Sequence, residues 1–186
     1  KKIWFNYLKF FSPESFFFKN HIMFIMEEDK IKNQIKSIKK IKNKISLDVK
    51  DQYEENPYPR WVNTKLEPRP LTINEVAAEL KLQVISEVDL VVESPQILIA
   101  GCGTGQHSMH TASRFKDCRV TAIDLSLSSL AYAKRKTKEV NVTNINYFQA
   151  DILDLTTLGK QFDIIESGGV LHHMADPISG WKILTD

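Results

Sequence analysis

The sequence predicts an α/β fold: a Rossmann-like parallel sheet, truncated after its fourth strand and preceded by a helical N-terminal extension. Three observations predict this fold. Short apolar runs alternate with segments of helical periodicity, a glycine-rich turn follows the first run, and acidic residues follow the next two. Strands that are joined by helices in this way form parallel sheets with right-handed crossovers.

The first apolar run, Ile97–Ala100, leads directly into glycines at alternate positions, Gly101, Gly103 and Gly105. Glycines let the backbone turn sharply and approach a ligand, and the N-terminus of the following helix then faces that ligand. In the dinucleotide fingerprint G-x-G-x-x-G the third glycine would stand at Gln106. The pattern therefore favours a nucleoside-type cofactor without a pyrophosphate over NAD.

The second apolar run, Val120–Ile123, ends at Asp124. A carboxylate at this strand tip is placed to accept hydrogen bonds from both hydroxyls of a ribose. Ser126 is an expected N-cap, and the helical pattern from Ser128 to Val140 is expected to return the chain to the next strand.

The third run, Ile145–Phe148, is followed by Asp151 and Ile152, and the fourth run is Phe162–Glu166. Asp151 is placed to bond the exocyclic amine of an adenine, and Ile152 to cover the face of the ring. Ligands of parallel sheets bind at the carboxyl ends of the strands. Since all these residues follow strands, we expect them to lie at one edge of the sheet.

At these positions the chain resembles the class I S-adenosylmethionine-dependent methyltransferases. The resemblance implies that S-adenosylmethionine is the cofactor and that its methyl group passes to an oxygen, nitrogen or carbon nucleophile. The family usually has an acidic residue two places before the first glycine, where this chain has Ile99. The expected cofactor-binding residues are Gly101, Cys102, Gly103, Gly105, Asp124, Leu125, Asp151, Ile152 and Glu166.

A second resemblance lies in Gln52–Trp61, which reads Q-Y-E-E-N-P-Y-P-R-W. The segment is similar to one that precedes the methyltransferase domain in a group of bacterial tetratricopeptide-repeat proteins. A helical-repeat partner domain is therefore expected. Tyr58, Arg60 and Trp61 offer aromatic faces and a guanidinium that suit a lid over a nucleoside or a substrate contact. The alternative is that the aromatic residues only pin the segment to the domain.

The chain divides into three expected parts: a lysine-rich helical extension over 1–50, an extended connector over 51–72, and the cofactor half of a methyltransferase domain over 73–186. Any helix before Pro57 should end near Asn56, because a residue before proline is pushed out of the helical region. Thr72-Ile73-Asn74-Glu75 forms a capping box that opens a helix. The family's sheet has seven strands, so the last three are expected to be missing.

Residues 1–50 hold 12 lysines and 5 acidic residues, although the whole chain has a formal net charge of only +2. Isoleucines recur there at helical spacing, which predicts one amphipathic basic helix. Packing of this helix on the protein's own core, or on a preceding helical domain, is favoured over binding to RNA or to an anionic membrane. The isoleucines are Ile31, Ile35, Ile38, Ile41 and Ile45. The aromatic start, Ile3 to Met26, is expected to form short helices rather than a membrane span or a signal peptide.

His172 is the candidate catalytic base, because it follows the fourth strand and a neutral imidazole can accept a proton near the methyl group. The methyl acceptor, a small molecule or a protein, is not defined by the sequence. No metal site, membrane or nucleic-acid partner is expected, and the cysteine usage fits a cytoplasmic protein. The main alternative is a non-catalytic module that binds S-adenosylmethionine and serves a helical scaffold.

Overall fold

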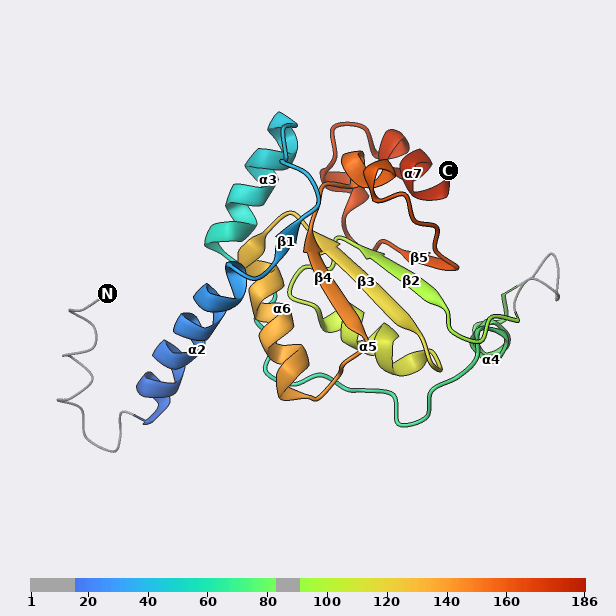
Figure 1. Ribbon diagram of the computed structural model, residues 1–186, viewed down its shortest axis with the longest axis horizontal. Helices are drawn as coiled ribbons and strands as arrows, with labels where there is room; N and C mark the ends of the chain where they lie inside the picture. The colour runs from blue at the N-terminus through green and yellow to red at the C-terminus, as the bar shows by residue number, and fades with distance from the viewer. Residues whose placement is uncertain (1–15, 83–90) are drawn as a thin grey trace.

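The computed structural model describes residues 16–82 and 91–186, with side chains from residue 22 onward. These residues form a five-stranded parallel sheet in the order β1-β4-β3-β2-β5 (Figure 1). The strands are β1 (Lys36–Ser37), β2 (Gln96–Ala100), β3 (Arg119–Asp124), β4 (Ile145–Gln149) and β5 (Ile164–Glu166). The sheet confirms the α/β, Rossmann-like class, and the last four strands are the four that the sequence predicts.

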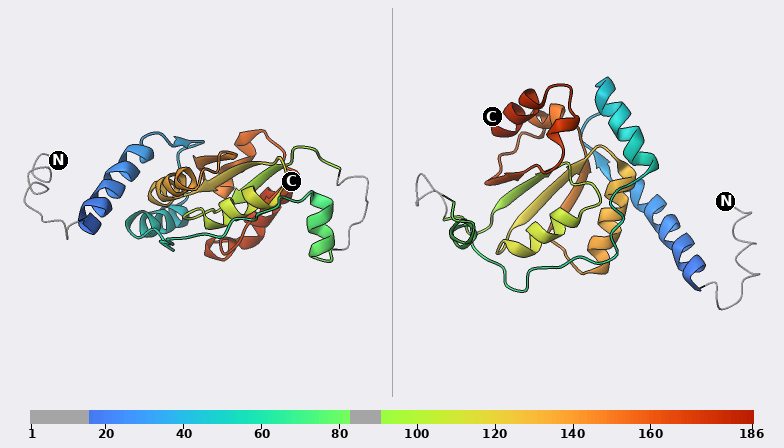
Figure 2. Two further views of the ribbon diagram at one scale, coloured as in Figure 1. Left: turned by 90° about the horizontal axis from the view of Figure 1, so that it is seen from below. Right: turned by 180° about the vertical axis from the view of Figure 1, so that it is seen from behind.

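Helices cover both faces of this sheet. They are α2 (Phe16–Lys32), α3 (Lys44–Glu55), α4 (Ile73–Glu79), α5 (Gln106–Arg114), α6 (Leu127–Glu139), α7 (Pro177–Thr185) and the 3-10 turns η3 (Ile152–Leu158) and η4 (Leu171–His173). Helices α5 and α6 pack on one face, whereas η3 and α7 pack on the other. Figures 1 and 2 show α3 and the segment from η4 to α7 at the same end of the sheet.

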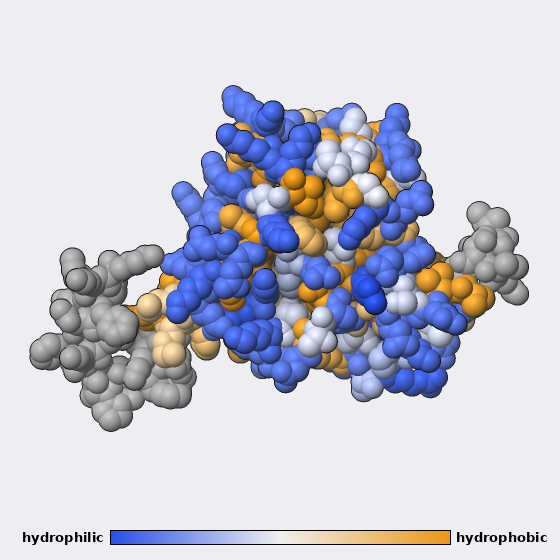
Figure 3. All heavy atoms as spheres, in the orientation of Figure 1, coloured by the Kyte–Doolittle hydropathy of each residue, from blue (hydrophilic) through white to orange (hydrophobic). Residues whose placement is uncertain are grey.

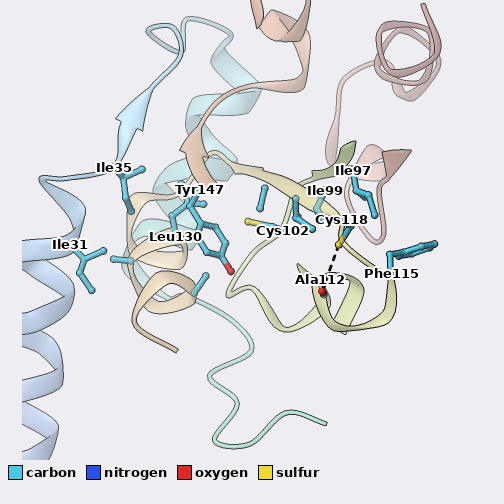
Figure 4. Close-up of a cluster of buried hydrophobic side chains, with 14 of the residues drawn as sticks. Ile31, Ile35, Ile97, Ile99, Cys102, Ala112, Phe115, Cys118, Leu130 and Tyr147 are labelled. Carbon is cyan, nitrogen blue, oxygen red and sulfur yellow. Dashed lines mark hydrogen bonds between the residues drawn. The ribbon is translucent and has the colours of Figure 1, made fainter. Parts of the chain in front are cut away.

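The core follows the alternation of side chains along the strands. Ile97 and Ile99 of β2 point into the cluster beneath α5 and α6, together with Leu130 (Figure 4), whereas Leu98 lies in the cluster beneath η3 and α7. All three β2 residues are almost completely buried. Because β2 is apolar on both faces, it can lie inside the sheet, and its carboxyl end is held firmly on both sides.

The predicted helix boundaries agree with the local hydrogen bonds. The Ser126 hydroxyl accepts a bond from the backbone N–H of Ser129 at the start of α6. The Thr72–Glu75 capping box is formed at the start of α4. Helix α3 ends at Glu55, directly before the Asn56-Pro57 pair, as the proline predicts.

The prediction of one continuous amphipathic helix through the five isoleucines is wrong. Helix α2 ends at Lys32, residues 36–37 form β1, and α3 begins only at Lys44. Ile31, Ile35 and Ile41 are nevertheless buried, and Figure 4 shows the first two on the side of the core cluster where Leu130 of α6 lies. The isoleucine spacing thus indicates buried positions, which here lie in a helix (Ile31) and in irregular segments (Ile35 and Ile41).

The open edge of β4 explains why the helix is interrupted. Its unpaired backbone groups need partners, and β1 supplies them by pairing Lys36 with Phe148. The N–H of Ile38 then donates to the carbonyl of Gln149 at 2.9 Å. The basic N-terminal part therefore contributes a strand to the sheet.

A buried ion pair fixes α2 on α6. Arg135 Nε lies 2.9 Å from Glu28 Oε1, and both side chains are more than nine-tenths buried.

The structure does not test the expected division of the chain into three parts, which stays a prediction, although helix α3 crosses the expected boundary between residues 50 and 51. Of the aromatic start, residues 3–15 lie outside the described part, and residues 16–26 belong to α2. Among the described helices, none is long and apolar enough to cross a membrane.

Candidate cofactor-binding site

A cavity of about 550 Å³ lies at the carboxyl ends of the strands. The loops after β2, β3, β4 and β5 form one wall, and α3 with the start of the connector forms the other. On the face drawn in Figure 3, apolar side chains show between the regions of α3 and α7, and hydrophilic atoms surround them. The volume falls within the range of roughly 300–1,000 Å³ that is usual for small-molecule and cofactor sites.

The sheet order places the candidate residues in a row. Asp151 and Ile152 follow β4, Asp124 ends β3, the glycine loop follows β2, and Gly168 follows β5; these residues all line the cavity. Neighbouring strands lie about 4.8 Å apart, so the row extends over about 14 Å. An elongated ligand would therefore lie across the strand ends.

Asp124 is held by the backbone. Its Oδ2 accepts the N–H of Gly103 at 2.8 Å, and its Oδ1 accepts the N–H of Ser126 at 2.9 Å. Each carboxylate oxygen accepts more than one hydrogen bond, so both retain capacity for ligand hydroxyls. Burial raises the pKa of Asp124, and the backbone hydrogen bonds oppose this shift.

The β4 end of the cavity combines a carboxylate with an apolar wall. Asp151 is almost fully buried, and its Oδ1 accepts the N–H of Leu153 at 3.0 Å. Ile152 is buried beside it, and Leu125 also lines this part of the cavity. Ser129 is a lining residue, and its buried hydroxyl has no hydrogen-bond partner among the described residues. These groups fit a flat heterocycle with polar edges.

The glycines of the loop have different roles. A Cβ on Gly101 would lie 2.2 Å from Val170 Cγ2, and one on Gly105 would lie 2.5 Å from the Cβ of Ala133 on α6. On Gly103 the nearest atom would be the carbonyl oxygen of Tyr58, 3.8 Å away. At Gly101 and Gly105 the missing side chain leaves room for protein neighbours, whereas at Gly103 the space is open. That the three glycines contact a cofactor stays a prediction.

The connector is pinned to this loop through Thr104. The indole Nε1 of Trp61 donates to the carbonyl of Thr104 at 3.1 Å, and the Thr104 hydroxyl donates to the carbonyl of Pro59 at 2.6 Å. Trp61 is buried against Tyr132. Arg60 lies 3.6 Å from Glu28. Among the three expected lid residues, only Tyr58 lines the cavity.

Glu54 fixes the end of α3 to the start of α6. Its Oε2 accepts the N–H of Ser128 at 3.0 Å and the hydroxyl of Ser126 at 3.1 Å. Burial acts to raise the pKa of Glu54, but the Ser128 hydrogen bonds and Lys32 outweigh it and lower the pKa. Helix α3, and with it one wall of the cavity, is therefore held beside Asp124.

Glu166, at the tip of β5, bonds to α5 rather than lining the cavity. Its Oε2 accepts the Thr111 hydroxyl at 2.6 Å and lies 2.9 Å from His107 Nε2. Burial acts to raise the pKa of Glu166, but the His107 and Thr111 hydrogen bonds outweigh it and lower the pKa. The hydrogen bond that His107 donates to Glu166 raises the pKa of His107, which does line the cavity.

His172 is exposed and lies outside the cavity lining, whereas its neighbour His173 lines the cavity. The sequence reasoning also missed His107, Thr104 and Tyr53. The position of His107, directly after the glycine loop, was the available signal. Among the described residues, no group of three histidine, cysteine or acidic side chains is arranged to hold a metal ion.

Comparison with known proteins agrees with this geometry. Residues 97–180 match a family of methyltransferase domains. This part of the chain is therefore similar to methyltransferase domains. The matched segment begins in β2 and ends within α7, so it contains the glycine loop, Asp124 and Asp151.

Similar proteins include an uncharacterized protein of Synechococcus sp., which is 39% identical over 91 residues, covering 48% of this chain and 22% of the relative. (S)-coclaurine N-methyltransferase of Papaver somniferum is 33% identical over 96 residues, covering 48% and 27%. Ubiquinone biosynthesis O-methyltransferase of Coxiella burnetii is 34% identical over 118 residues, covering 63% and 47%. The matches span less than half the length of each of these relatives.

Proposed function

We propose that the cavity binds S-adenosylmethionine and that the protein transfers the methyl group of this cofactor to an acceptor. The order of groups along the strand ends carries the proposal. A buried acidic and apolar site for an adenine at β4, a carboxylate for a ribose at β3, and an open glycine at β2 follow one another in the order of the cofactor's own parts.

The residues present fit this cofactor. Asp124 keeps lone pairs for the two ribose hydroxyls, Asp151 offers an acceptor for the adenine amine, and Ile152 offers an apolar face. At Gly103 the absence of a side chain lets the ligand contact the loop backbone.

The bound cofactor would supply an electrophilic methyl group on a sulfonium. The chain's own contribution is to orient the cofactor and to admit the acceptor in line with the methyl group, which is a positioning role. Part of the cavity lining is not assigned to the cofactor and is left to contact the methyl acceptor. It consists of α3, His173 and the residues after β5. One similar protein is named an N-methyltransferase and another an O-methyltransferase. The proposal therefore does not specify whether the acceptor atom is nitrogen, oxygen or carbon.

The competing proposal is a module that binds the cofactor without turnover. Incubation of the protein with radiolabelled S-adenosylmethionine and a metabolite extract separates the two functions. Our proposal predicts that label moves into an acceptor, with S-adenosylhomocysteine formed in equal amount. Saturable binding of the cofactor without transfer to any component would instead support the binding module.

We also propose an associated domain, a cellular location and a class of partner for this protein. The Q-Y-E-E-N-P-Y-P-R-W segment supports association with a tetratricopeptide-repeat domain, and its hydrogen bonds to the glycine loop support a role beside the cofactor site. Both cysteines, Cys102 and Cys118, are free and buried, which supports a cytoplasmic location. A small molecule or a protein, rather than nucleic acid or a membrane, is the proposed partner.

A further inference from the structure

The loop between β1 and α3 concentrates positive charge. Residues 36–44 hold five lysines and no acidic residue. Lys39 is paired with Asp154. The other four are exposed and have neither an ion pair nor a side-chain hydrogen bond within the described part of the chain. These entrance lysines are Lys36, Lys40, Lys42 and Lys44.

Contacts along this loop hold it in place. Strand β1 pairs with β4, Ile38 packs in the cluster beneath η3 and α7, and Ile41 is buried. At the far end, Asn43 caps α3, because its side chain accepts the N–H of Ser46 at 3.1 Å. The entrance lysines are therefore kept close together although like charges repel, and an anion beside them would relieve that repulsion.

The same loop borders the cavity. Because β1 is parallel to the other strands, the loop leaves the sheet at the edge where the cavity lies (Figure 1). Asn43, Ile45 and Ser46 line the cavity, and Lys42 and Lys44 stand on either side of Asn43 in the chain. A ligand bound on the α3 side of the cavity would thus have positive charge beside its outer end.

The adjoining part of the cavity is mainly apolar. Ile45 and Val49 of α3 and Met174 after η4 line it. Asp176, an acidic residue on this side, is engaged as the cap of α7, and it accepts the hydroxyl of Ser179. Since the cofactor is proposed to occupy the strand ends, this part of the cavity is left for an acceptor with an apolar body.

We infer that the methyl acceptor is an anionic small molecule. Its apolar body contacts the α3 side of the cavity, and its carboxylate or phosphate group lies beside the entrance lysines. An ammonium close to a carboxylate or a phosphate forms charge-assisted hydrogen bonds, which are stronger than neutral ones. This inference rests on the proposed function, because it assumes that the cofactor fills the strand ends.

The extent of the positive charge favours a small anion over RNA. Residues 45–55, which continue the loop into α3, hold four acidic residues and one lysine. The sign of the charge therefore reverses along this helix. Proteins that bind single-stranded RNA use a positively charged groove that follows the backbone over several nucleotides. A positive region confined to one loop beside a cavity suits a single anionic group.

Three small probes and one RNA test the inference on the full chain saturated with S-adenosylhomocysteine. Phenylacetate and phenyl phosphate carry the two anionic groups on an apolar ring, 2-phenylethanol is their neutral counterpart, and a short uridine oligonucleotide represents RNA. Amide chemical shifts of the isotope-labelled protein give both the affinity and the position of each probe.

We expect the two anions to bind roughly tenfold more tightly than 2-phenylethanol and to shift the amides of residues 40–46. Their affinity should fall about fivefold between roughly 0.05 and 0.5 M NaCl, because salt screens exposed charges. The tighter of the two anions shows whether a carboxylate or a phosphate is the preferred group.

The variant Lys42→Gln/Lys44→Gln removes two entrance lysines. Its matched control, Lys65→Gln/Lys160→Gln, removes the same charge from exposed lysines outside the cavity lining that have no ion pair among the described residues. The first variant should weaken both anions about fivefold, and the control by less than about twofold. Both should keep their affinity for S-adenosylhomocysteine, which shows that they are folded.

Equal binding of the anions and 2-phenylethanol would overturn the inference, as would an equal loss in the control variant. The absence of anion binding by a chain that binds S-adenosylhomocysteine would overturn the inference alone. Tighter binding of the RNA than of the anions at equal salt would also overturn it, and would indicate a nucleic-acid partner. A folded chain that does not bind S-adenosylhomocysteine overturns the proposed function, and this inference with it.

Discussion

The glycines of the cofactor loop differ in what an added side chain would meet. At Gly101, alanine would clash with Val170, and the backbone angle φ of +80° adds strain. We expect Gly101→Ala to lower the free energy of unfolding by about 2–5 kcal/mol, because overpacking and a left-handed backbone both cost energy. Gly103→Ala, where φ is +52° and space is open, should cost only about 1–2 kcal/mol.

Urea denaturation of the two variants checks this difference. The double variant Gly101→Ala/Val170→Ala should recover part of the loss, since it removes the two clashing methyl groups of Val170. Equal destabilisation by the two glycine substitutions, with no recovery in the double variant, would contradict the separate roles.

The pair of His107 and Glu166 predicts a pH dependence of stability. The lowered pKa of Glu166 gives stability that is present above its ordinary pKa of 4.5 and is lost as pH falls through the folded-state value. The raised pKa of His107 gives stability that is present below its ordinary pKa of 6.5 and is lost as pH rises through the folded-state value. The pair therefore stabilises most between these two values.

Thermal unfolding of the wild type and of His107→Gln at several pH values measures this contribution. Because both groups are partly exposed, we expect no more than about 1 kcal/mol. The advantage of the wild type over the variant should be largest near pH 5–6 and should shrink above the ordinary pKa of 6.5. An advantage that stays constant from acid to alkaline pH would show that His107 acts only by packing.

At the level of elements, the connector has an anchoring residue and a cavity-facing residue. Trp61→Ala should lower the free energy of unfolding by about 3–5 kcal/mol, because Trp61 is buried and bonds to the glycine loop. Tyr58 is 74% exposed and lines the cavity, so Tyr58→Ala should change stability by less than about 0.5 kcal/mol. Chemical denaturation gives the stabilities, and ligand titration should show a loss of affinity for both variants. A Tyr58→Ala protein as destabilised as Trp61→Ala would contradict this assignment.

The sequence predicts the central strands well because each is an apolar run that ends in a diagnostic residue. Val120–Ile123 before Asp124 is an example, and the observed β3 ends at that residue. It does not predict β1, since Lys36–Ser37 has no apolar signal and is recruited by the backbone pairing with β4 and by the hydrogen bond from the Ser37 hydroxyl to Gln149. The isoleucine pattern failed for a related reason, because burial at Ile35 comes from tertiary packing and not from helical periodicity.

The residues of the candidate site likewise include some that could be predicted from the sequence and some that could not. Residues that directly follow strands, such as Asp124 and Asp151, could be placed from the sequence because the topology brings strand ends together. Residues that depend on the paths of loops could not: His173 rather than His172 reaches the cavity, and Trp61 turns into the core. The wall contributed by α3 depends on the Glu54 contacts to α6, which lie more than 70 residues away in the sequence.

For the whole molecule, the cavity joins two regions that are distant in the chain. The matched methyltransferase-domain segment, 97–180, supplies the strand ends, whereas residues 43–59 supply the opposite wall. Glu54, Trp61 and Thr104 hold the two regions together. The cofactor site is therefore a property of both regions, and binding should be measured on the chain that contains both.

Whether the cavity binds S-adenosylmethionine is tested most directly by calorimetric titration of the folded chain with this cofactor, with NAD as the competing ligand and Asp124→Ala as the variant. We predict selective, saturable binding of S-adenosylmethionine. Asp124→Ala should weaken it by about 1.5–3 kcal/mol, roughly ten- to a hundredfold, through loss of charge-assisted bonds to the ribose. Asp154→Asn, which removes a charge paired with Lys39 outside the cavity lining, should leave the affinity unchanged. Tighter binding of NAD, or no binding of S-adenosylmethionine by the folded chain, would contradict the account.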